Sequence, residues 1–566
     1  MTGGLFGGTK EVAMGMRRRR RCARLRRLSR RELVKMGLLA SGAAMWPLRG
    51  LQAAVGDDDD SDDDSVDDDD FGGGPDVIPF ERDLPLPEVL EPVTEFSDQN
   101  FPDPTCPLDV PGFGGLPSPV LYEVRMQAGE QEIIPGFMTE FWGYTGNSGF
   151  PLYPGPTIKV ERNKPIVVRF INELPVETSI HNHGGHTGAH SDGFPNDFIF
   201  PGQFKDYCYP NIAPDDDDSE FATFQWYHDH AMDITGENVY MGLAAFCLLT
   251  DHVEQNLIDM GKLPGLDFDI PMVFQDRLFD SQAQLIYDPM DHDGVIGNRF
   301  LANGAVQPRF HVKRCKYRFR ILNGSNARIY ALKLSTGQKF LQIGNDSWML
   351  PQAVERAHLL LGAAERADVI IDFTDAPDEV FLTNHLTHDL DDGRGPQEDI
   401  DRPRKWQRNG TPLVKFIVEG TPENNATIGT GDLLRVHTPI DPGEIVRTRR
   451  FEFDRSHGAW VINDRFFDPD RDDATPKIGT AERWILENDS GVWVHPIHLH
   501  LEAHQIQRIN GKAPPPHMAA KKDTVLLGDF SAEMFMKFRT FPGRFAFHCH
   551  NLEHEDMCMM GVFNVQ

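Results

Sequence analysis

From about residue 76 to the C-terminus, short apolar runs alternate with polar turns. PTIKVERNKPIVVRFINEL predicts two strands around a polar turn at Arg162 to Lys164, and FATFQWYHDH ends a further strand. The same pattern recurs in PMVFQDRLF, KYRFRILNGSNARIYALKL and ADVIIDFT, and again in RRFEFDR, AERWILEND, FMKFRTF and RFAFHCH. Alternation of apolar and polar residues is typical of strands with one buried face, and long apolar runs at helical period are scarce.

These runs form three successive β-rich blocks, each long enough for one domain. We therefore predict an all-β chain of three β-sandwich domains, at residues 76–255, 256–425 and 426–566. The absence of a short-period repeat in the sequence argues against a propeller or solenoid. The polar segment from His385 to Gly410 interrupts the second block and is expected to be a long surface loop.

Composition supports this interpretation and adds a charge asymmetry. The 566 residues are 40% hydrophobic and include 51 Gly and 41 Pro, which suits several cores joined by many turns. The net charge is -30, yet residues 1–54 hold thirteen Lys/Arg and two Glu, a balance of +11, so the rest carries -30 - 11 = -41. An acidic surface of this kind argues against nucleic-acid binding and keeps a protein soluble.

The first 54 residues have the pattern of an export signal. SRRELVK (Ser29 to Lys35) resembles a twin-arginine signal, and the apolar stretch from Met36 to Leu48 is too short to span a bilayer. A basic arm that binds nucleic acid is the alternative for Arg17 to Arg21. We expect the protein to be exported to the periplasm or the extracellular space, without stable membrane insertion and as a monomer.

An acidic linker follows at residues 55–75. It contains DDDDSDDDSVDDDD, eleven Asp in fourteen residues, which cannot bury a core and is expected to be disordered. A calcium loop is the alternative, but the Gly and Glu placement of such a loop is missing.

Four His-x-His pairs stand out in the chain. With 22 His in 566 residues, about one such pair is expected by chance, and four occur: His181/His183, His228/His230, His498/His500 and His548/His550. On a strand, residues i and i+2 project from one face about 6.6 Å apart, so each pair can offer two imidazoles to neighbouring metal ions. Because two pairs lie in the first block and two in the third, a shared site would lie between the first and last domains.

The segment HCHNLEHEDMCMM adds a second kind of site. Cys549 lies between His548 and His550, so on a strand its sulfur faces away from both imidazoles. A Cys thiolate with two His and a weak axial Met is typical of blue copper, and His554, Met559 and the more distant His495 supply these groups. Iron–sulfur ligation would need more Cys, and haem attachment would need Cys-x-x-Cys-His.

The blocks IHNHGGHTGAHSDG, WYHDHAMD, HPIHLHLEAH and HCHNLEHEDMCMM resemble those of three-domain multicopper oxidases. The flanks YPGPTIKV, KYRFRILNGSNARIY and AERADVIIDF are most similar to the bacterial spore-coat laccase and bilirubin oxidase branch, and the resemblance extends from about residue 95 onward. It implies three cupredoxin-like Greek-key domains and four copper ions, one of type 1, one of type 2 and two of type 3.

The resemblance also implies a role for each ligand position. The type 1 copper would be held by His495, Cys549, His554 and Met559, and the type 2 copper by His181 and His498. The type 3 pair would be held by His183, His228, His230, His500, His548 and His550. The other twelve His, which include His186, His190, His504 and His517, are expected to be ordinary core or surface residues.

Two acids match residues that deliver protons in this branch. Asp192 in SDG and Glu555 in HED are the candidates, and a turn-capping Asp and a loop Glu are the ordinary alternatives. Asn182 departs from the apolar residue that relatives often carry between the first two His. Cys558 next to Met559 is a further departure, interpreted as an unligated thiol or a disulfide partner, with ligation or oxidation as the alternative, and Met557 or Met560 is an alternative axial ligand.

Beyond Cys22 in the signal and Cys549, five Cys remain: Cys106, Cys208, Cys247, Cys315 and Cys558. Five is an odd number, so at least one is unpaired, and the sequence does not determine the pairing.

The predicted function is a laccase-like multicopper oxidase. It would couple four one-electron oxidations of phenolic, aminophenolic or bilirubin-like substrates to the reduction of O2 to two waters. One alternative is a metal oxidase that acts on Mn(II) or Cu(I), since the acidic loop around Asp389 to Asp401 would gather cations. Another is a copper-storage protein without turnover.

Overall fold

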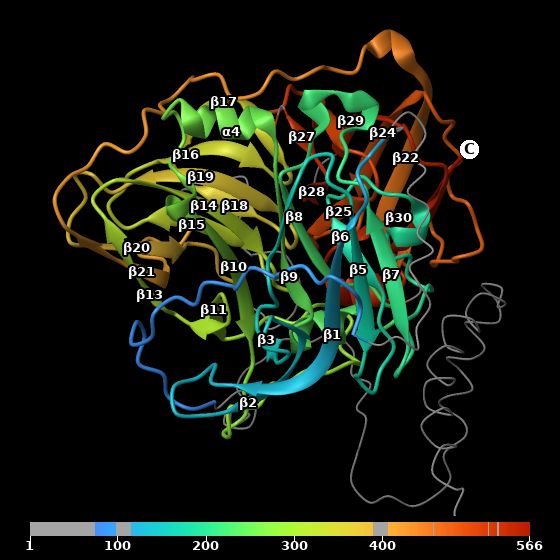
Figure 1. Cartoon of the computed structure of the whole chain (residues 1–566). Coiled ribbons are helices and arrows are strands. Elements are labelled where there is room, and N and C mark those ends of the chain that lie inside the picture. Colours follow the sequence, from blue (N-terminus) through green and yellow to red (C-terminus); the bar gives the residue numbers. More distant parts are fainter. Residues whose placement is uncertain (1–73, 98–114, 389–405, 457, 519, 529–530) are drawn as a thin grey trace, which may run out of the picture. The chain divides into compact units, whose positions relative to one another are not determined.

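Within the described residues, strand pairing forms six sheets, two for each of three successive stretches of sequence (Figure 1). The computed structural model describes residues 74–97, 115–388, 406–456, 458–518, 520–528 and 531–566. The signal at 1–54 and nearly all of the acidic linker at 55–75 lie outside these residues. The same holds for most of the loop predicted at 385–410.

The first stretch forms a five-stranded and a four-stranded sheet. The five-stranded sheet has the order β3 (Pro151–Leu152), β2 (Thr139–Thr145), β1 (Val120–Gln131), β5 (Ile166–Asn172) and β7 (Phe204–Tyr209). The other has the order β4 (Ile158–Glu161), β9 (Ala244–Thr250), β8 (Phe224–Asp229) and β6 (Ile180–His183). The two strands predicted around Arg162 to Lys164 are present as β4 and β5, but they enter different sheets instead of pairing as a hairpin.

The second stretch forms a seven-stranded and a five-stranded sheet. The former has the order β12 (Ala305–Val306), β11 (Arg299–Ala302), β10 (Asp269–Arg277), β14 (Lys316–Asn323), β19 (Arg366–Asp372), β16 (Phe340–Asn345) and β17 (Trp348–Arg356). The latter has the order β13 (Arg309–Lys313), β21 (Thr411–Glu419), β20 (Glu379–Asn384), β15 (Tyr330–Leu334) and β18 (Leu359–Leu361).

The third stretch forms a six-stranded and a four-stranded sheet. The first has the order β23 (Ala459–Ile462), β22 (Ile445–Ser456), β24 (Ala481–Asn488), β29 (Ser531–Lys537), β26 (His504–Ile509) and β27 (Lys521–Lys522). The second has the order β28 (Thr524–Leu527), β25 (His495–Leu499), β30 (Gly543–Cys549) and β31 (Met560–Val565).

Helices are few and short in the described residues. The α-helices are α3 (Thr235–Met241), α4 (His252–Asp259) and α5 (Leu552–Asp556). The 3-10 helices are η1 (Ala189–Ser191), η2 (Pro214–Asp216), η3 (Asp218–Glu220), η4 (Leu266–Phe268) and η6 (Pro442–Glu444). The all-β prediction is therefore confirmed, whereas the residue boundaries of the three domains stay a prediction.

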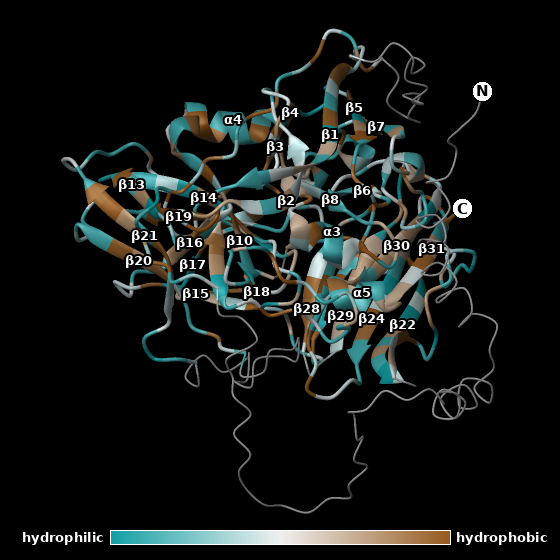
Figure 2. Ribbon diagram, turned by 90° about the horizontal axis from the view of Figure 1, so that it is seen from below, coloured by the Kyte–Doolittle hydropathy of each residue, from teal (hydrophilic) through white to brown (hydrophobic). Residues whose placement is uncertain are grey.

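Each pair of sheets encloses an apolar core of its own. Val124 and Phe170 lie in the first core, Phe319 and Phe416 in the second, and Trp484 in the third, all at 0% exposure. Strands of each stretch carry both brown apolar and teal polar residues in Figure 2, as expected for strands with one buried face. Burial of these alternating apolar faces favours sandwiches over isolated sheets.

A buried ion cluster joins the first and second stretches. Glu254 on α4 accepts hydrogen bonds from Arg318 Nη1 and Arg320 Nη2 of β14, each at 2.7 Å. Arg318 also binds Asp368, and Arg320 binds Asp269. The charges compensate one another inside the protein, and the cluster links α4 to β14.

Candidate metal centres

The four His-x-His motifs lie on four strands, or begin on a strand and end just after it. These strands form two adjacent pairs, β6 with β8 and β25 with β30. β6 carries His181 and His183 and runs antiparallel to β8, where His181 lies opposite His228. β25 runs antiparallel to β30, where His498 lies opposite His548. The strand register therefore places a histidine of one motif directly opposite a histidine of the motif on the adjacent strand.

The two halves meet between the first and third stretches. His181 Nε2 lies 3.3 Å from His498 Nε2, and His230 Nε2 lies 3.1 Å from His548 Nε2. The ring of His183 stacks on that of His498, with centroids 3.6 Å apart. These side chains are buried, so the eight imidazoles form one cluster away from solvent.

Within the cluster, nitrogen atoms gather in three groups of three. In each group, one ligand atom per residue lies within 4.8 Å of the others: His183, His228 and His550; His230, His500 and His548; His181, His498 and His500. The first two groups hold six different residues, and the third adds His181 and His498 while sharing His500.

Hydrogen bonds to carbonyl groups determine the tautomers of His181 and His498. His181 Nδ1–H donates to Asp192 O at 2.6 Å, and His498 Nδ1–H donates to Asp523 O at 2.8 Å. Burial lowers the pKa of both imidazoles well below the usual value, so each carries a single proton. The two Nε2 atoms, which face each other at 3.3 Å, are therefore both unprotonated. Their lone pairs point toward each other, and a cation between them would stabilise this arrangement.

A backbone carbonyl also orients the ring of His548. Its Nδ1–H donates to Cys549 O at 3.0 Å, so its Nε2 points to His230 Nε2 at 3.1 Å and to His500 Nε2 at 3.3 Å. His228 Nε2 lies buried without a hydrogen-bond partner among the described residues. Converging, unprotonated nitrogen atoms of this kind are the donor set of a metal site.

On the other side of β30, Cys549 forms a separate group. Its Sγ lies 3.4 Å from His495 Nδ1 and 3.7 Å from His554 Nδ1, and the two Nδ1 atoms are 3.1 Å apart. His554 Nε2–H donates to Asp293 O at 3.0 Å, which leaves Nδ1 unprotonated with a free lone pair. Burial raises the pKa of the Cys549 thiol well above its usual value, so a thiolate here requires a bound cation.

The backbone after β30 returns the chain to this second group. Cys549 N–H donates to Met559 O at 3.0 Å, and Met559 N–H donates to His554 O at 2.9 Å. Asn551 caps α5 through its side chain, which accepts from His554 N–H. The buried Met559 thus follows directly on the turn that holds Cys549 and His554.

Two buried tryptophans cover His554. The indole of Trp460 packs on the His554 ring with centroids 3.8 Å apart, and Trp493 lies at 5.5 Å from the same ring. Trp460 Nε1–H donates to His292 O at 2.7 Å, which holds the indole in place. Together with Asp293 O, these groups exclude water from the second site.

Both acids predicted from the sequence contact the eight-imidazole cluster. Asp192 Oδ2 accepts from His500 Nδ1–H at 2.7 Å, and Glu555 Oε2 lies 2.9 Å from His548 Nδ1. Burial raises the pKa of Asp192 well above the usual carboxyl value. Burial also acts to raise the pKa of Glu555, but His548 and His230 outweigh it and lower that pKa to about 2.

Comparisons with known proteins identify the family. Family models described as multicopper oxidase match residues 128–253 and 439–566. A bilirubin oxidase from Albifimbria verrucaria is 33% identical over 460 residues, 78% of this chain and 76% of that protein. A laccase from Bacillus subtilis (strain 168) is 30% identical over 550 residues, 85% and 97% of the two chains. The chain belongs to the multicopper oxidase family.

Structural similarity agrees with this assignment. The crystal structure of a multi-copper oxidase from Pediococcus acidilactici has a TM-score of 0.71 and 29% identity, and the match covers 87% of this chain and 93% of that chain. As a multicopper oxidase, the chain is a laccase-like oxidoreductase that uses copper. The unprotonated imidazole nitrogens and the buried thiol described above fit this metal, for which imidazole and thiolate are suitable ligands.

Asp523, which was not predicted from the sequence, contacts imidazoles from both halves of this multicopper oxidase. Its Oδ1 accepts from His183 Nε2–H at 3.1 Å, and its carbonyl accepts from His498 Nδ1–H. Arg366 from β19 binds both carboxylate oxygens, at 2.7 and 2.5 Å. The available signal was the charged triplet KKD inside the otherwise apolar run AAKKDTVLL.

The remaining predictions concern His and Cys residues outside these ligand groups. Among the described residues, His186, His190, His504 and His517 lie outside the metal-binding groups. Cys247, Cys315 and Cys558 are free thiols, whereas Cys208 is disulfide-bonded. Cys22 and Cys106 lie outside the described residues, and so does the twin-arginine-like motif. Within the described part, no helix has both the length and the apolar character needed to span a bilayer.

Proposed function

We propose that this multicopper oxidase holds four copper ions and oxidises small phenolic, aminophenolic or bilirubin-like molecules while reducing O2 to two waters. The observation that carries the proposal is the juxtaposition at β30. Cys549 faces His495 and His554 on one side, and its chain neighbours His548 and His550 face the eight-imidazole cluster on the other. Bound copper would supply one-electron redox chemistry at both places.

The geometric groups support a specific set of ligands. We assign the type 1 site to His495, Cys549, His554 and Met559, and the type 2 site to His181 and His498. The two type 3 sites take His183, His228 and His550, and His230, His500 and His548, respectively. His183 would bind through Nδ1, because its Nε2–H donates to Asp523 and its Nδ1 has no partner in the described residues.

The chain's own residues have separate tasks in this reaction. Trp460 and the Asp293 carbonyl keep water from His554, and the two peptide bonds of Cys549 link the second site to His548 and His550 by a short covalent path. Reduction of O2 to two waters consumes four protons, which must reach a cluster that is closed to solvent.

The two acids suit the delivery of these protons. The raised pKa of Asp192 favours a proton on its carboxyl group, whose Oδ1 lies 3.6 Å from His181 Nδ1. The lowered pKa of Glu555 favours the carboxylate, which accepts a proton next to His548. Acids whose environments move their pKa values apart are suited to opposite roles, so Asp192 would donate protons and Glu555 would accept them from the surroundings.

We further propose that the protein is a monomer that works outside the cytoplasm, in the periplasm or extracellular space, after export by a twin-arginine-type route. The motif SRRELVK supports export. Its partners would be a small reducing substrate and O2, without nucleic acid or stable membrane insertion.

Oxygen uptake with a panel of reductants tests the proposed function. The copper-loaded protein should be blue and should consume O2 with phenols, and Cys549→Ser should abolish both properties. Cys558→Ser is the matched control, because Cys558 is also buried and free but does not belong to the metal-binding groups.

Two other outcomes would favour the alternatives. Fast oxidation of Mn(II) or Cu(I) without phenol oxidation would indicate a metal oxidase. A blue protein that consumes no O2 with any reductant would indicate copper storage.

A further inference from the structure

A cavity of about 370 Å³ lies between the second and third stretches of the chain, apart from the imidazole cluster. One wall comes from β16, β17, β18 and the start of β19, and the other from residues 509–518 and 522–526. Apolar side chains line much of it, among them Leu359, Leu361, Ile509, Met518 and Leu526. Cavities of this size are at the lower end of those that hold small molecules.

Arg356 at the end of β17 brings an uncompensated positive charge to this cavity. Its guanidinium forms no ion pair with a described residue, and its Nη1 is buried without a hydrogen-bond partner there. Burial lowers the pKa of Arg356 to about 10, and no neighbouring carboxylate opposes this shift. The side chain is still protonated at neutral pH, so it is a donor without an acceptor.

The other charged groups in the lining do not satisfy Arg356. Glu365 pairs with Lys522 at 3.1 Å, and Lys522 is bound in addition by Asp346 at 3.0 Å. Lys512 at the rim is a further cation. The lining thus has an excess of positive charge, although the whole chain carries a net charge of -30.

Neutral polar groups also line the cavity, among them His517 and Gln342. Burial and the Arg356 charge lower the pKa of His517 to about 2, so its imidazole is neutral at physiological pH. The Oε1 atom of Gln342 is buried without a hydrogen-bond partner among the described residues. A ligand with a hydroxyl group besides an anionic group would satisfy this oxygen as well as Arg356 Nη1.

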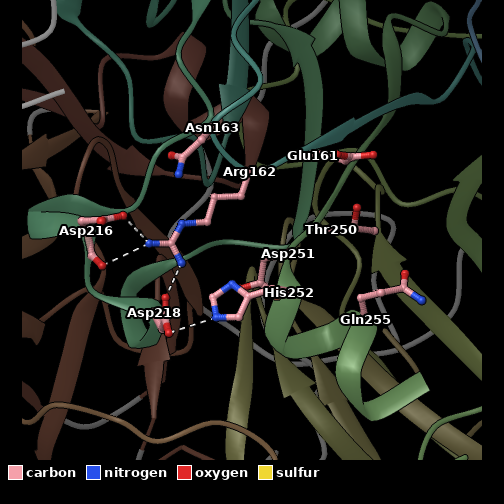
Figure 3. A pocket seen from close by; sticks show the side chains of 9 residues that line it. All are labelled: Glu161, Arg162, Asn163, Asp216, Asp218, Thr250, Asp251, His252 and Gln255. Carbon is pink, nitrogen blue, oxygen red and sulfur yellow. Dashed lines mark hydrogen bonds and ion pairs between the residues drawn. The ribbon is translucent and has the colours of Figure 1, made fainter. Parts of the chain in front are cut away.

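A second cavity, of about 550 Å³, shows the contrasting arrangement (Figure 3). There Arg162 extends between Asp216 and Asp218, and it forms ion pairs with both. His252 Nε2 lies 3.3 Å from the same Asp218. The positive charge of Arg162 in this second cavity is therefore already neutralised by the protein, whereas that of Arg356 is not.

We propose that the cavity between β17 and residues 509–518 binds a small carboxylate with an apolar body. The carboxylate accepts hydrogen bonds from Arg356, and the apolar body packs against Leu359, Leu361, Ile509 and Leu526. A carboxylate matches the planar guanidinium donor, and burial of the apolar body supplies the rest of the affinity. This inference is independent of copper and of the oxidase reaction.

Calorimetric titration with octanoate on the copper-loaded protein tests the proposal, with octan-1-ol as the uncharged control. Octanoate should bind at least about tenfold more tightly than octan-1-ol, since a hydrogen bond to a charged group contributes roughly a factor of ten to a hundred. From hexanoate to octanoate, affinity should rise about fourfold per methylene group. Equal binding of acid and alcohol, or no dependence on chain length, would overturn the proposal.

Three variants separate the site from general electrostatics. Arg356→Met should weaken octanoate binding about tenfold or more, and Arg356→Lys should restore part of the affinity. Arg450→Met is the matched control, because Arg450 is an exposed surface cation paired with Glu487. Unchanged binding in Arg356→Met, or equal losses in Arg356→Met and Arg450→Met, would contradict the assignment. The comparison of acid with alcohol needs no variant, so it decides the question even if Arg356→Met fails to fold.

Discussion

Asp523→Asn is the most informative single change in the imidazole cluster. The wild-type carboxylate accepts two hydrogen bonds from Arg366 and one from His183 Nε2–H. It thereby compensates a guanidinium at 0% exposure and keeps the proton of His183 away from Nδ1, the atom assigned to copper. Asparagine preserves the shape of the side chain but replaces one acceptor oxygen with an NH2 donor.

Either orientation of the new amide loses at least one of these contacts, because Oδ1 accepts from both His183 and Arg366 Nη1. With the NH2 group toward Arg366, two donors face each other. With the NH2 group toward His183, the amide donates to Nε2, which moves the imidazole proton to Nδ1 and prevents ligation there. Rotation of the amide therefore cannot restore the wild-type arrangement.

The expected loss in unfolding free energy is about 3 kcal/mol. Removal of one partner from a buried ion pair typically costs about 3–5 kcal/mol. Arg366 retains hydrogen bonds to Ala364 O at 2.9 Å and Ser347 Oγ at 2.6 Å, which favours the lower end of that range. Loss of a residue that orients a metal ligand typically weakens metal affinity about 10- to 100-fold.

Metal analysis and denaturant unfolding measure the two effects separately. We expect fewer copper ions in the imidazole cluster, slower O2 uptake and retained blue colour, because Asp523 does not contact Cys549, His495 or His554. Asp472→Asn, which breaks the partly exposed pair with Arg544, should change stability by about 1 kcal/mol or less. Full copper content together with wild-type stability in Asp523→Asn would refute the reasoning.

Three further changes test other parts of the structure. Asp269, whose pKa is lowered to about 2 by its guanidinium neighbours although burial acts to raise it, stabilises the fold above about pH 4, and this contribution is lost as the pH falls through 2. Asp269→Asn should therefore cost about 2 kcal/mol at pH 6, and unfolding free energies of variant and wild type should converge toward pH 2; a constant difference would contradict this. Gly193 has φ +72°, and a Cβ there would lie 2.2 Å from Ile180 O, so Gly193→Ala should lower stability by about 1–3 kcal/mol and slow O2 uptake; a wild-type unfolding curve would exclude this strain. Trp460→Ala should cost about 3–5 kcal/mol and alter the blue absorption band through its contact with His554; an unchanged spectrum would refute that contact.

Local patterns were sufficient for the strands and for the side of β30 on which each ligand lies. The buried run IVVRFIN became β5, and the alternation of His548, Cys549 and His550 placed the thiol opposite the two imidazoles. These features depend only on the period of two along a strand. Sheet membership was not predictable in the same way, since β4 and β5 enter different sheets although only four residues separate them.

The sequence by itself determined the class of fold, the family and the residue types of the metal-binding groups, because these depend on periodicity, composition and short motifs. Only the tertiary structure decided which imidazoles share a group, since His183 and His550 are more than 360 residues apart in the chain and meet only after folding. Only the tertiary structure also showed that Asp523 binds Arg366 and that Arg356 lines a cavity. Whether a buried charge is compensated depends on oppositely charged side chains from other strands, and a local sequence pattern does not predict these partners.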